Sequence, residues 1–107
     1  MTNNQFNLAE LNFKFCYLSF DDIIHLSNGI KFNSTIFKID LSNNGLKACT
    51  FKFFLDSLVD NSTLNDLRLC GNLLDNEFAV DLAHLLESNS TLKIVDISKN
   101  PIGKEGA

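Results

Sequence analysis

The strongest constraint on the fold of this chain is a motif that returns four times at one fixed spacing. Segments that begin at Leu8, Ile36, Leu64 and Leu92 align at intervals of 28 residues without an insertion or deletion. A fixed period of roughly 20 to 50 residues is typical of proteins that stack one supersecondary unit on the next. We therefore expect a single domain over residues 1–107, with repeats at 8–35, 36–63, 64–91 and, in part, 92–107.

Each unit changes its hydrophobic period along its length. In the third unit, Leu67 and Leu69 alternate with polar residues, which predicts a short strand. Over residues 76–87 the apolar residues return at every third or fourth position, which indicates an amphipathic helix. Phe51 and Phe54 repeat this helical spacing in the second unit. The sequence thus predicts a strand, a turn and a helix in each unit.

Asparagines mark both turns of the predicted unit. Those that follow the strand can satisfy backbone groups that no neighbouring strand reaches, and we expect them to form a ladder. The first unit has Cys16 at this place. A second set begins an Asn-Ser-Thr sequence between each helix and the next strand, and we interpret it as a structural turn rather than as a glycosylation site. The two sets are Asn44, Asn72 and Asn100, and Asn33, Asn61 and Asn89.

The complete motif resembles that of the leucine-rich repeat family. It reads L-x-x-L-x-L-x-x-N-x-L, and the tail at residues 100–107 reads N-x-I-G-x-x-G-A, which resembles the ribonuclease-inhibitor-like subclass with 28-residue repeats. The resemblance implies an α/β solenoid, a curved stack with parallel strands on its concave face and helices on its convex face. The third unit carries the motif through Leu64, Leu67, Leu69, Asn72 and Leu74.

The same resemblance predicts a stack of about 3.5 to 4 repeats that is truncated at its C-terminal end. The sequence stops at Ala107, where the fourth helix is due to begin. Stacked-repeat proteins need a polar unit to close each end. We therefore expect a fragment of a longer protein, and a truncated gene model or a chain completed by a partner are the alternatives. Exposed ends of repeat stacks can bind one another, so self-association through the uncapped C-terminal end is a further prediction.

Composition argues against several classes of partner. The net charge is −4 and no basic stripe is visible, so we expect no nucleic acid and no anionic membrane surface as a partner. No apolar run reaches the length of about 18 residues that spans a membrane, and the polar N-terminus does not look like a signal peptide. Cys16, Cys49 and Cys70 are odd in number and match no metal motif, which favours reduced thiols and a cytoplasmic protein.

The alternation along each strand predicts a grid of polar side chains on the inner face. With strands about 4.8 Å apart, equivalent residues form columns across the sheet. Two columns, Glu10–Lys38–Asp66 and Asp40–Arg68–Asp96, alternate in sign. The structural alternative to binding is pairing between these exposed charges, worth about 0–1 kcal/mol per pair. The candidate protein-binding residues are Glu10, Asn12, Lys14, Lys38, Asp40, Ser42, Asp66, Arg68, Cys70, Ile94, Asp96 and Ser98.

Two aromatic residues, Phe15 and Phe37, flank this grid at positions outside the predicted core. Exposed aromatic side chains can anchor a partner. The alternative is that they fold over the strand ends and cover the core.

The sequence offers no catalytic, cofactor-binding or metal-binding constellation. His25 and His84 fall on separate predicted helices, and no glycine-rich phosphate loop is present. We therefore expect a non-enzymatic protein-interaction module from a leucine-rich repeat scaffold or regulator, which binds an unidentified protein through its concave face. Two alternatives stay open: a fragment of a GTPase-activating or enzyme-regulating protein of the same subclass, and a sensing segment of an immune-type receptor.

Overall fold

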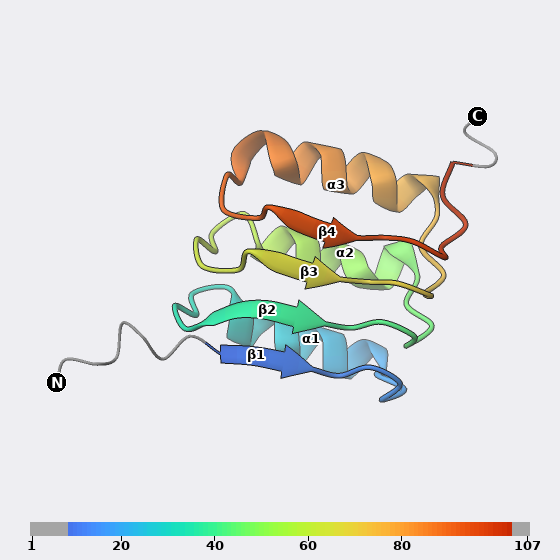
Figure 1. The fold of residues 1–107 in the computed structure, drawn as a ribbon, viewed down its shortest axis with the longest axis horizontal. Coiled ribbons are helices and arrows are strands. Elements are labelled where there is room, and N and C mark those ends of the chain that lie inside the picture. The colour runs from blue at the N-terminus through green and yellow to red at the C-terminus, as the bar shows by residue number, and fades with distance from the viewer. Residues whose placement is uncertain (1–8, 104–107) are drawn as a thin grey trace, which may run out of the picture.

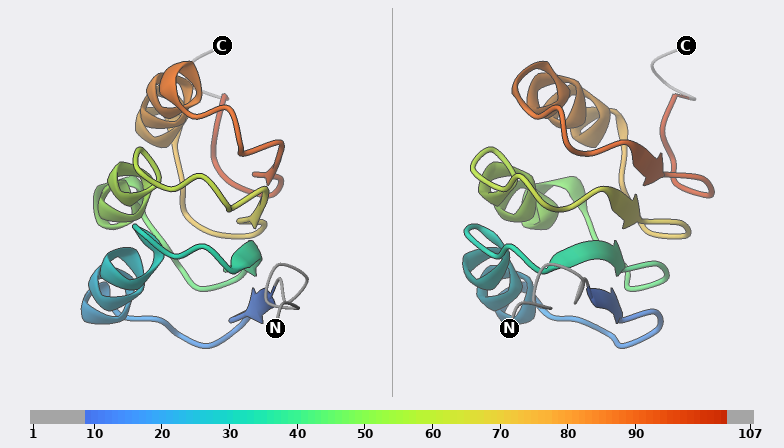
Figure 2. Two further views of the ribbon diagram at one scale, coloured as in Figure 1. Left: turned by 90° about the vertical axis from the view of Figure 1, so that its left-hand side faces the viewer. Right: turned by 60° about the vertical axis from the view of Figure 1, so that its left-hand side comes forward.

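The computed structural model describes residues 9–103 as one sheet with helices on one of its faces (Figure 1). Its four parallel strands lie side by side in sequence order. Figure 2 shows that all three helices cover the same face of the sheet, and we call the opposite face the open strand face. The elements are β1 (Ala9–Asn12), α1 (Phe20–Ile30), β2 (Ile36–Asp40), α2 (Ala48–Ser57), β3 (Asp66–Arg68), α3 (Asn76–Ser88) and β4 (Ile94–Asp96).

Part of the predicted pattern lies outside the described residues. This applies to Leu8, with which the first motif begins, and to residues 104–107 of the tail. Within residues 9–103, no helix has both the length and the apolar character that a membrane crossing requires.

The strand register places one apolar residue of each strand in a continuous row. Leu11 pairs with Ile39, Ile39 with Leu67, and Leu67 with Val95. Ile39 and Leu67 have a strand on each side and are fully buried. Leu11 and Val95 lie in β1 and β4 and are half-buried against the same core. The row is thus buried most deeply where a strand covers it from both sides.

Phenylalanine fills the space between the sheet and the helices. Phe51, Phe54 and Phe78 are essentially inaccessible to solvent. The rings of Phe51 and Phe54 stack with their centroids 4.8 Å apart, and Phe78 of α3 lies 6.0 Å from Phe51 of α2. Burial of one such side chain stabilises a fold by about 1.5–3 kcal/mol. The aromatic core therefore ties α2 to α3.

Local hydrogen bonds define where two of the helices begin. Ser19 Oγ accepts from the backbone N–H of Asp22, and Asp22 Oδ2 accepts from the backbone N–H of Ser19, which forms a capping box at α1. At α3, Asp75 Oδ1 accepts from the N–H of Glu77. Helix α2 begins at Ala48, and its N-cap residue, Lys47, forms no side-chain capping bond. Its position depends more on the buried phenylalanines than on its own N-terminus.

The asparagines after the strands form the expected ladder between units. Asn72 Oδ1 accepts from the backbone N–H groups of Asn44 and Leu46, 28 and 26 residues earlier. Its Nδ2 donates to the carbonyls of Leu41 and Leu69. Asn44 and Asn100 make equivalent bonds to the unit before each of them. One buried side chain thus joins two consecutive turns.

A left-handed backbone conformation recurs in the turn after every strand. The residue in question has a φ of 57° at Phe15, 61° at Asn43, 73° at Gly71 and 58° at Lys99, at intervals of 28 residues. A Cβ on Gly71 would collide with Asn43 Oδ1, so glycine is favoured there by both conformation and space. The asparagines of the turn between helix and strand, including Asn33, are not among the residues with positive φ.

The expected fold class is wrong as stated. We expected a curved solenoid of about 3.5 to 4 repeats with a truncated C-terminal end, whereas the described residues form a small domain of four parallel strands and three helices. The physical reason is that a motif match counts strands and turns, while a unit also needs a helix. The fourth match contributes only β4 within the described residues.

Candidate functional site

Eight of the twelve predicted grid residues form two columns on the open strand face, and the other four, Lys14, Ser42, Cys70 and Ser98, lie in the turns after the strands. Glu10 lies opposite Lys38, Lys38 opposite Asp66, and Asp66 opposite Ile94. The second column joins equivalent positions of the four strands in the same register, and its members are Asn12, Asp40, Arg68 and Asp96.

Arg68 forms a two-pronged ion pair along its own strand rather than across strands. Its Nε donates to Asp66 Oδ1 at 2.6 Å, and its Nη2 donates to Asp66 Oδ2 at 2.9 Å. The hydrogen bond with Asp66, and then the charge of Asp66, raise the pKa of Arg68, and the charges of Asp96 and Asp40 act in the same direction. The guanidinium is therefore fixed in orientation among three carboxylates.

The other members of the Arg68 column have a structural role. Asn12 Oδ1 accepts from the backbone N–H of Lys14, and the Oδ1 atoms of Asp40 and Asp96 accept from the N–H groups two residues after them, each at 3.0 Å. Ser98 lowers the pKa of Asp96, first through its hydroxyl and then through its backbone N–H. These three side chains hold the turn that follows their strand.

Arg68 departs from this pattern because it has no side-chain oxygen to offer. The N–H of Cys70, two residues later, donates instead to Ser42 Oγ of the preceding unit at 3.1 Å. Ser42 is consequently buried, although it lies on the open strand face. The turn keeps its hydrogen bond, and the Arg68 side chain is released from the role that its equivalents perform.

The remaining candidates differ in how much surface they offer. Asp66 is buried beneath Arg68, and Cys70 is half-buried. Ile94 is the apolar member of the grid and is 43% exposed. Lys38, Asp40 and Asp96 are half-buried, and the exposed candidates are Glu10, Asn12, Lys14 and Ser98.

The two predicted aromatic anchors differ in their exposure to solvent. Phe15 is 65% exposed at a left-handed turn position, where a phenylalanine is uncommon. Phe37 is half-buried in β2, and its backbone carbonyl accepts from the N–H of Asn65. Phe15 is thus the one of the two that presents its ring to solvent.

A shallow hollow of about 340 Å³ lies on the open strand face. It collects charges of both signs from β2, β3 and β4 and from the turn after β1. Lys14 and Lys38 form no ion pair within 4.0 Å among the described residues. The lining residues are Lys14, Lys38, Asp40, Ser42, Asn43, Arg68, Cys70 and Asp96.

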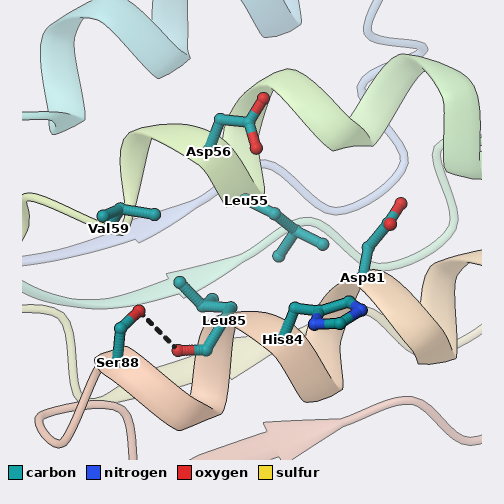
Figure 3. A pocket seen from close by; sticks show the side chains of 7 residues that line it. All are labelled: Leu55, Asp56, Val59, Asp81, His84, Leu85 and Ser88. Atoms are coloured by element: carbon teal, nitrogen blue, oxygen red, sulfur yellow. Dashed lines mark hydrogen bonds between the residues drawn. The ribbon is translucent and has the colours of Figure 1, made fainter.

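A second, smaller groove of about 150 Å³ lies between α2 and α3 (Figure 3). Asp81 Oδ2 is buried there and has no hydrogen-bond partner among the described residues. Asp56 stands on the opposite helix, and His84 lies one turn along α3 from Asp81. Across residues 9–103, no three His, Cys, Asp or Glu side chains are grouped so as to hold a metal ion.

Sequence reasoning missed both Asn43 and this helix groove. Asn43 lines the hollow from a left-handed turn, and its position is shared by Phe15, Gly71 and Lys99. The signal was available in the glycine of the third unit, because glycine often marks such a conformation. Nothing in the sequence distinguishes Asp81 from an ordinary exposed helix residue.

The sequence is similar to a segment of a human protein named for its domains. It is 29% identical over 107 residues to human NACHT, LRR and PYD domains-containing protein 13. The aligned segment covers 99% of this chain and 10% of that protein. The chain spans about a tenth of the length of the curated relatives it matches. No family model matches the sequence.

Two solved structures superpose on nearly the whole chain. Leiomodin-1 actin-binding site 2 has a TM-score of 0.82 at 18% identity, over 96% of this chain and 61% of that one. The tropomodulin C-terminal domain of Caenorhabditis elegans has a TM-score of 0.79 at 16% identity, over 92% of this chain and 59% of that one. These likenesses concern the fold, and they support a small leucine-rich-repeat-like domain in place of the truncated solenoid.

The resemblance to leucine-rich repeat proteins is thus confirmed by a relative whose name includes such a domain. It is also consistent with the parallel-strand fold. The ribonuclease-inhibitor-like subclass stays a prediction.

Proposed function

We propose that this chain is a non-enzymatic protein-binding module that contacts its partner through the open strand face, with Arg68 at the centre. The observation that carries the proposal is the departure of Arg68 from the column that it shares with Asn12, Asp40 and Asp96. Those three side chains cap their own turns, whereas the Arg68 turn is capped by Ser42.

The chemistry of Arg68 suits recognition. Asp66 takes up Nε and one hydrogen of Nη2, which leaves Nη1 and the other Nη2 hydrogen without a partner among the described residues. A guanidinium held by a bidentate carboxylate loses little further freedom on binding. Arginine is also among the residues that dominate binding energy at protein interfaces. Lys14 and Lys38 extend the same surface toward β1.

Actin is the first partner to test, because one of the superposing structures is named as an actin-binding site. We propose the cytoplasm as the compartment and a scaffold or regulator as the parent protein. A sensing segment of an immune-type receptor is the second candidate, supported by the human relative with NACHT, LRR and PYD domains. Self-association through the uncapped C-terminal end stays a prediction, and size-exclusion chromatography with light scattering tests it.

The test compares Arg68→Glu and Lys38→Glu with a matched charge reversal on the helix side. Lys52 of α2 is exposed, so Lys52→Glu changes the net charge equally without touching the open strand face. Each variant is first shown by circular dichroism to fold. Cosedimentation with actin filaments and crosslinking in cell extract then measure binding.

We expect Arg68→Glu to weaken binding to actin, or to the partner identified by crosslinking, at least about tenfold. Lys38→Glu should have a smaller effect, and Lys52→Glu should bind as the original chain does. Equal binding by all three variants would remove the open strand face from the proposal. Loss of binding by Lys52→Glu alone would move the site to the helix side.

A further inference from the structure

Three Asn-Ser-Thr sequences occupy equivalent turns of the fold, at Asn33, Asn61 and Asn89. In each turn the asparagine Oδ1 accepts from the backbone N–H groups two and three residues later. The distances lie between 2.7 and 2.9 Å in all three turns. The oxygen atom therefore has the same role three times.

The nitrogen atom does not have the same role in the three turns. Asn61 Nδ2 donates to the carbonyls of Ile30 at 2.7 Å and Asn33 at 3.3 Å. Asn89 Nδ2 donates to the carbonyls of Leu58 at 2.9 Å and Asn61 at 3.2 Å. Both hydrogens of each amide are thus used. The bonds also give a second donor to the carbonyls of Ile30 and Leu58 at the C-terminal ends of α1 and α2, each of which already accepts from the backbone N–H three residues later.

Burial distinguishes these two asparagines further. Asn61 is 4% exposed and Asn89 is 7% exposed. Asn33 is half-buried, and its Nδ2 has no hydrogen-bond acceptor among the described residues. Only the Asn33 amide retains a hydrogen that the described fold does not use.

Asn-x-Ser/Thr is the acceptor sequence for N-linked glycosylation. The transfer forms a bond between Nδ2 and the anomeric carbon of the sugar, and it breaks the bond between that carbon and the diphosphate of a lipid-linked donor. The displaced amide proton leaves to solvent. A glycosylated Nδ2 keeps one hydrogen, so at Asn61 or Asn89 one of the two bonds to the preceding unit is lost and the sugar takes the space of the preceding carbonyls.

We infer that the folded protein and a glycan at Asn61 or Asn89 exclude each other, and that Asn33 is the acceptor of the three that the fold tolerates. The chain accordingly reaches its native state only when the acceptor sequences at Asn61 and Asn89 are not glycosylated. This inference is independent of the proposed partner and of the role of Arg68.

The test directs the full chain into the secretory pathway of cultured cells behind a signal peptide. Limited proteolysis separates resistant, folded molecules from sensitive ones, and mass spectrometry measures the glycan at each asparagine in both fractions. We expect glycans at Asn61 and Asn89 only in the sensitive fraction, and a glycan at Asn33 in the resistant fraction. A resistant molecule with a glycan at Asn61 or Asn89 would overturn the inference.

Two control variants distinguish the effect of the glycan from the effect of losing the asparagine amide. Thr63→Ala with Thr91→Ala removes both acceptor sequences and keeps both asparagines, and the hydroxyls of Thr63 and Thr91 form no hydrogen bond among the described residues. This double variant should shift the secreted chain into the resistant fraction several-fold. An unfolded variant, Leu67→Asp, should carry glycans at Asn61 and Asn89, because no fold competes with transfer. If the double variant is as sensitive to protease as the glycosylated chain, the inference fails.

Discussion

The turn asparagines and the open strand face follow the same 28-residue spacing, yet they use their polar atoms in opposite ways. Asn72 uses the oxygen and the nitrogen of its amide in bonds to two units and is 4% exposed. Arg68 retains N–H groups without partners among the described residues and is about a third exposed, at 34% of its side chain. A repeated residue type thus indicates a scaffold role, and a break in the repetition indicates where another role is available.

The largest expected effect comes from placing a charge under the sheet. Leu67→Asp buries a carboxylate in the row between Ile39 and Val95, where Leu67 is fully inaccessible. The cost of several kcal/mol is comparable with the total stability of a small domain, about 5–15 kcal/mol. We expect no cooperative transition in thermal unfolding followed by circular dichroism. A normal melting curve for this variant would contradict the register of the sheet.

Loss of a ladder amide should be the next largest effect. Asn72→Ala leaves the backbone N–H groups of Asn44 and Leu46 without a partner, and we expect the free energy of unfolding to fall by about 3 kcal/mol. The carbonyls of Leu41 and Leu69 each keep another asparagine amide as donor. The control is Asn28→Ala on the exposed side of α1, which should change it by less than about 0.5 kcal/mol. Urea unfolding measures both. Equal effects would erase the contrast between ladder and surface asparagines.

Alanine substitutions at two glycines with positive φ should have a smaller effect on the free energy of unfolding. Gly71→Ala should cost about 2 kcal/mol, because φ is positive there and the new Cβ meets the Asn43 side chain. Gly45→Ala has a positive φ but open space around it, and should cost about 1 kcal/mol. Adding Asn43→Gly to Gly71→Ala should recover the difference between them. Urea unfolding that shows no recovery would assign the whole cost to backbone conformation.

The smallest expected effect is a change in how stability depends on pH. Ser98 lowers the pKa of Asp96 below its ordinary value of 3.8. A carboxyl group with a lowered pKa in the folded state contributes stability above its unfolded pKa, and this contribution is lost as pH falls through the folded pKa. Ser98→Ala should therefore be less stable than the original chain at pH 7 and at pH 5, and the difference should shrink below about pH 3.8. A difference that persists unchanged at pH 2 would remove Asp96 as its cause.

Much of the element pattern was predictable from the sequence. The alternation at Leu67 and Leu69 and the helical spacing of Phe51 and Phe54 predicted side chains that the structure buries. The number of repeats stays a prediction, because the fourth motif supplies β4 without a described helix. Arg68 was predicted to lie opposite Asp40 and Asp96, but its pairing with Asp66 along the strand depends on side-chain geometry that register does not determine.

The sequence by itself determined the period, the apolar row and the positions of the turn asparagines, since these follow from residue type and spacing along one chain. Only the tertiary structure decided which polar atoms remain available. Ser42 reaches Cys70, and Asn61 reaches Ile30, across 28 and 31 residues. Such bonds depend on how one unit stacks on the next. Residues of the same type at the same repeat position therefore differ in which of their polar atoms form hydrogen bonds.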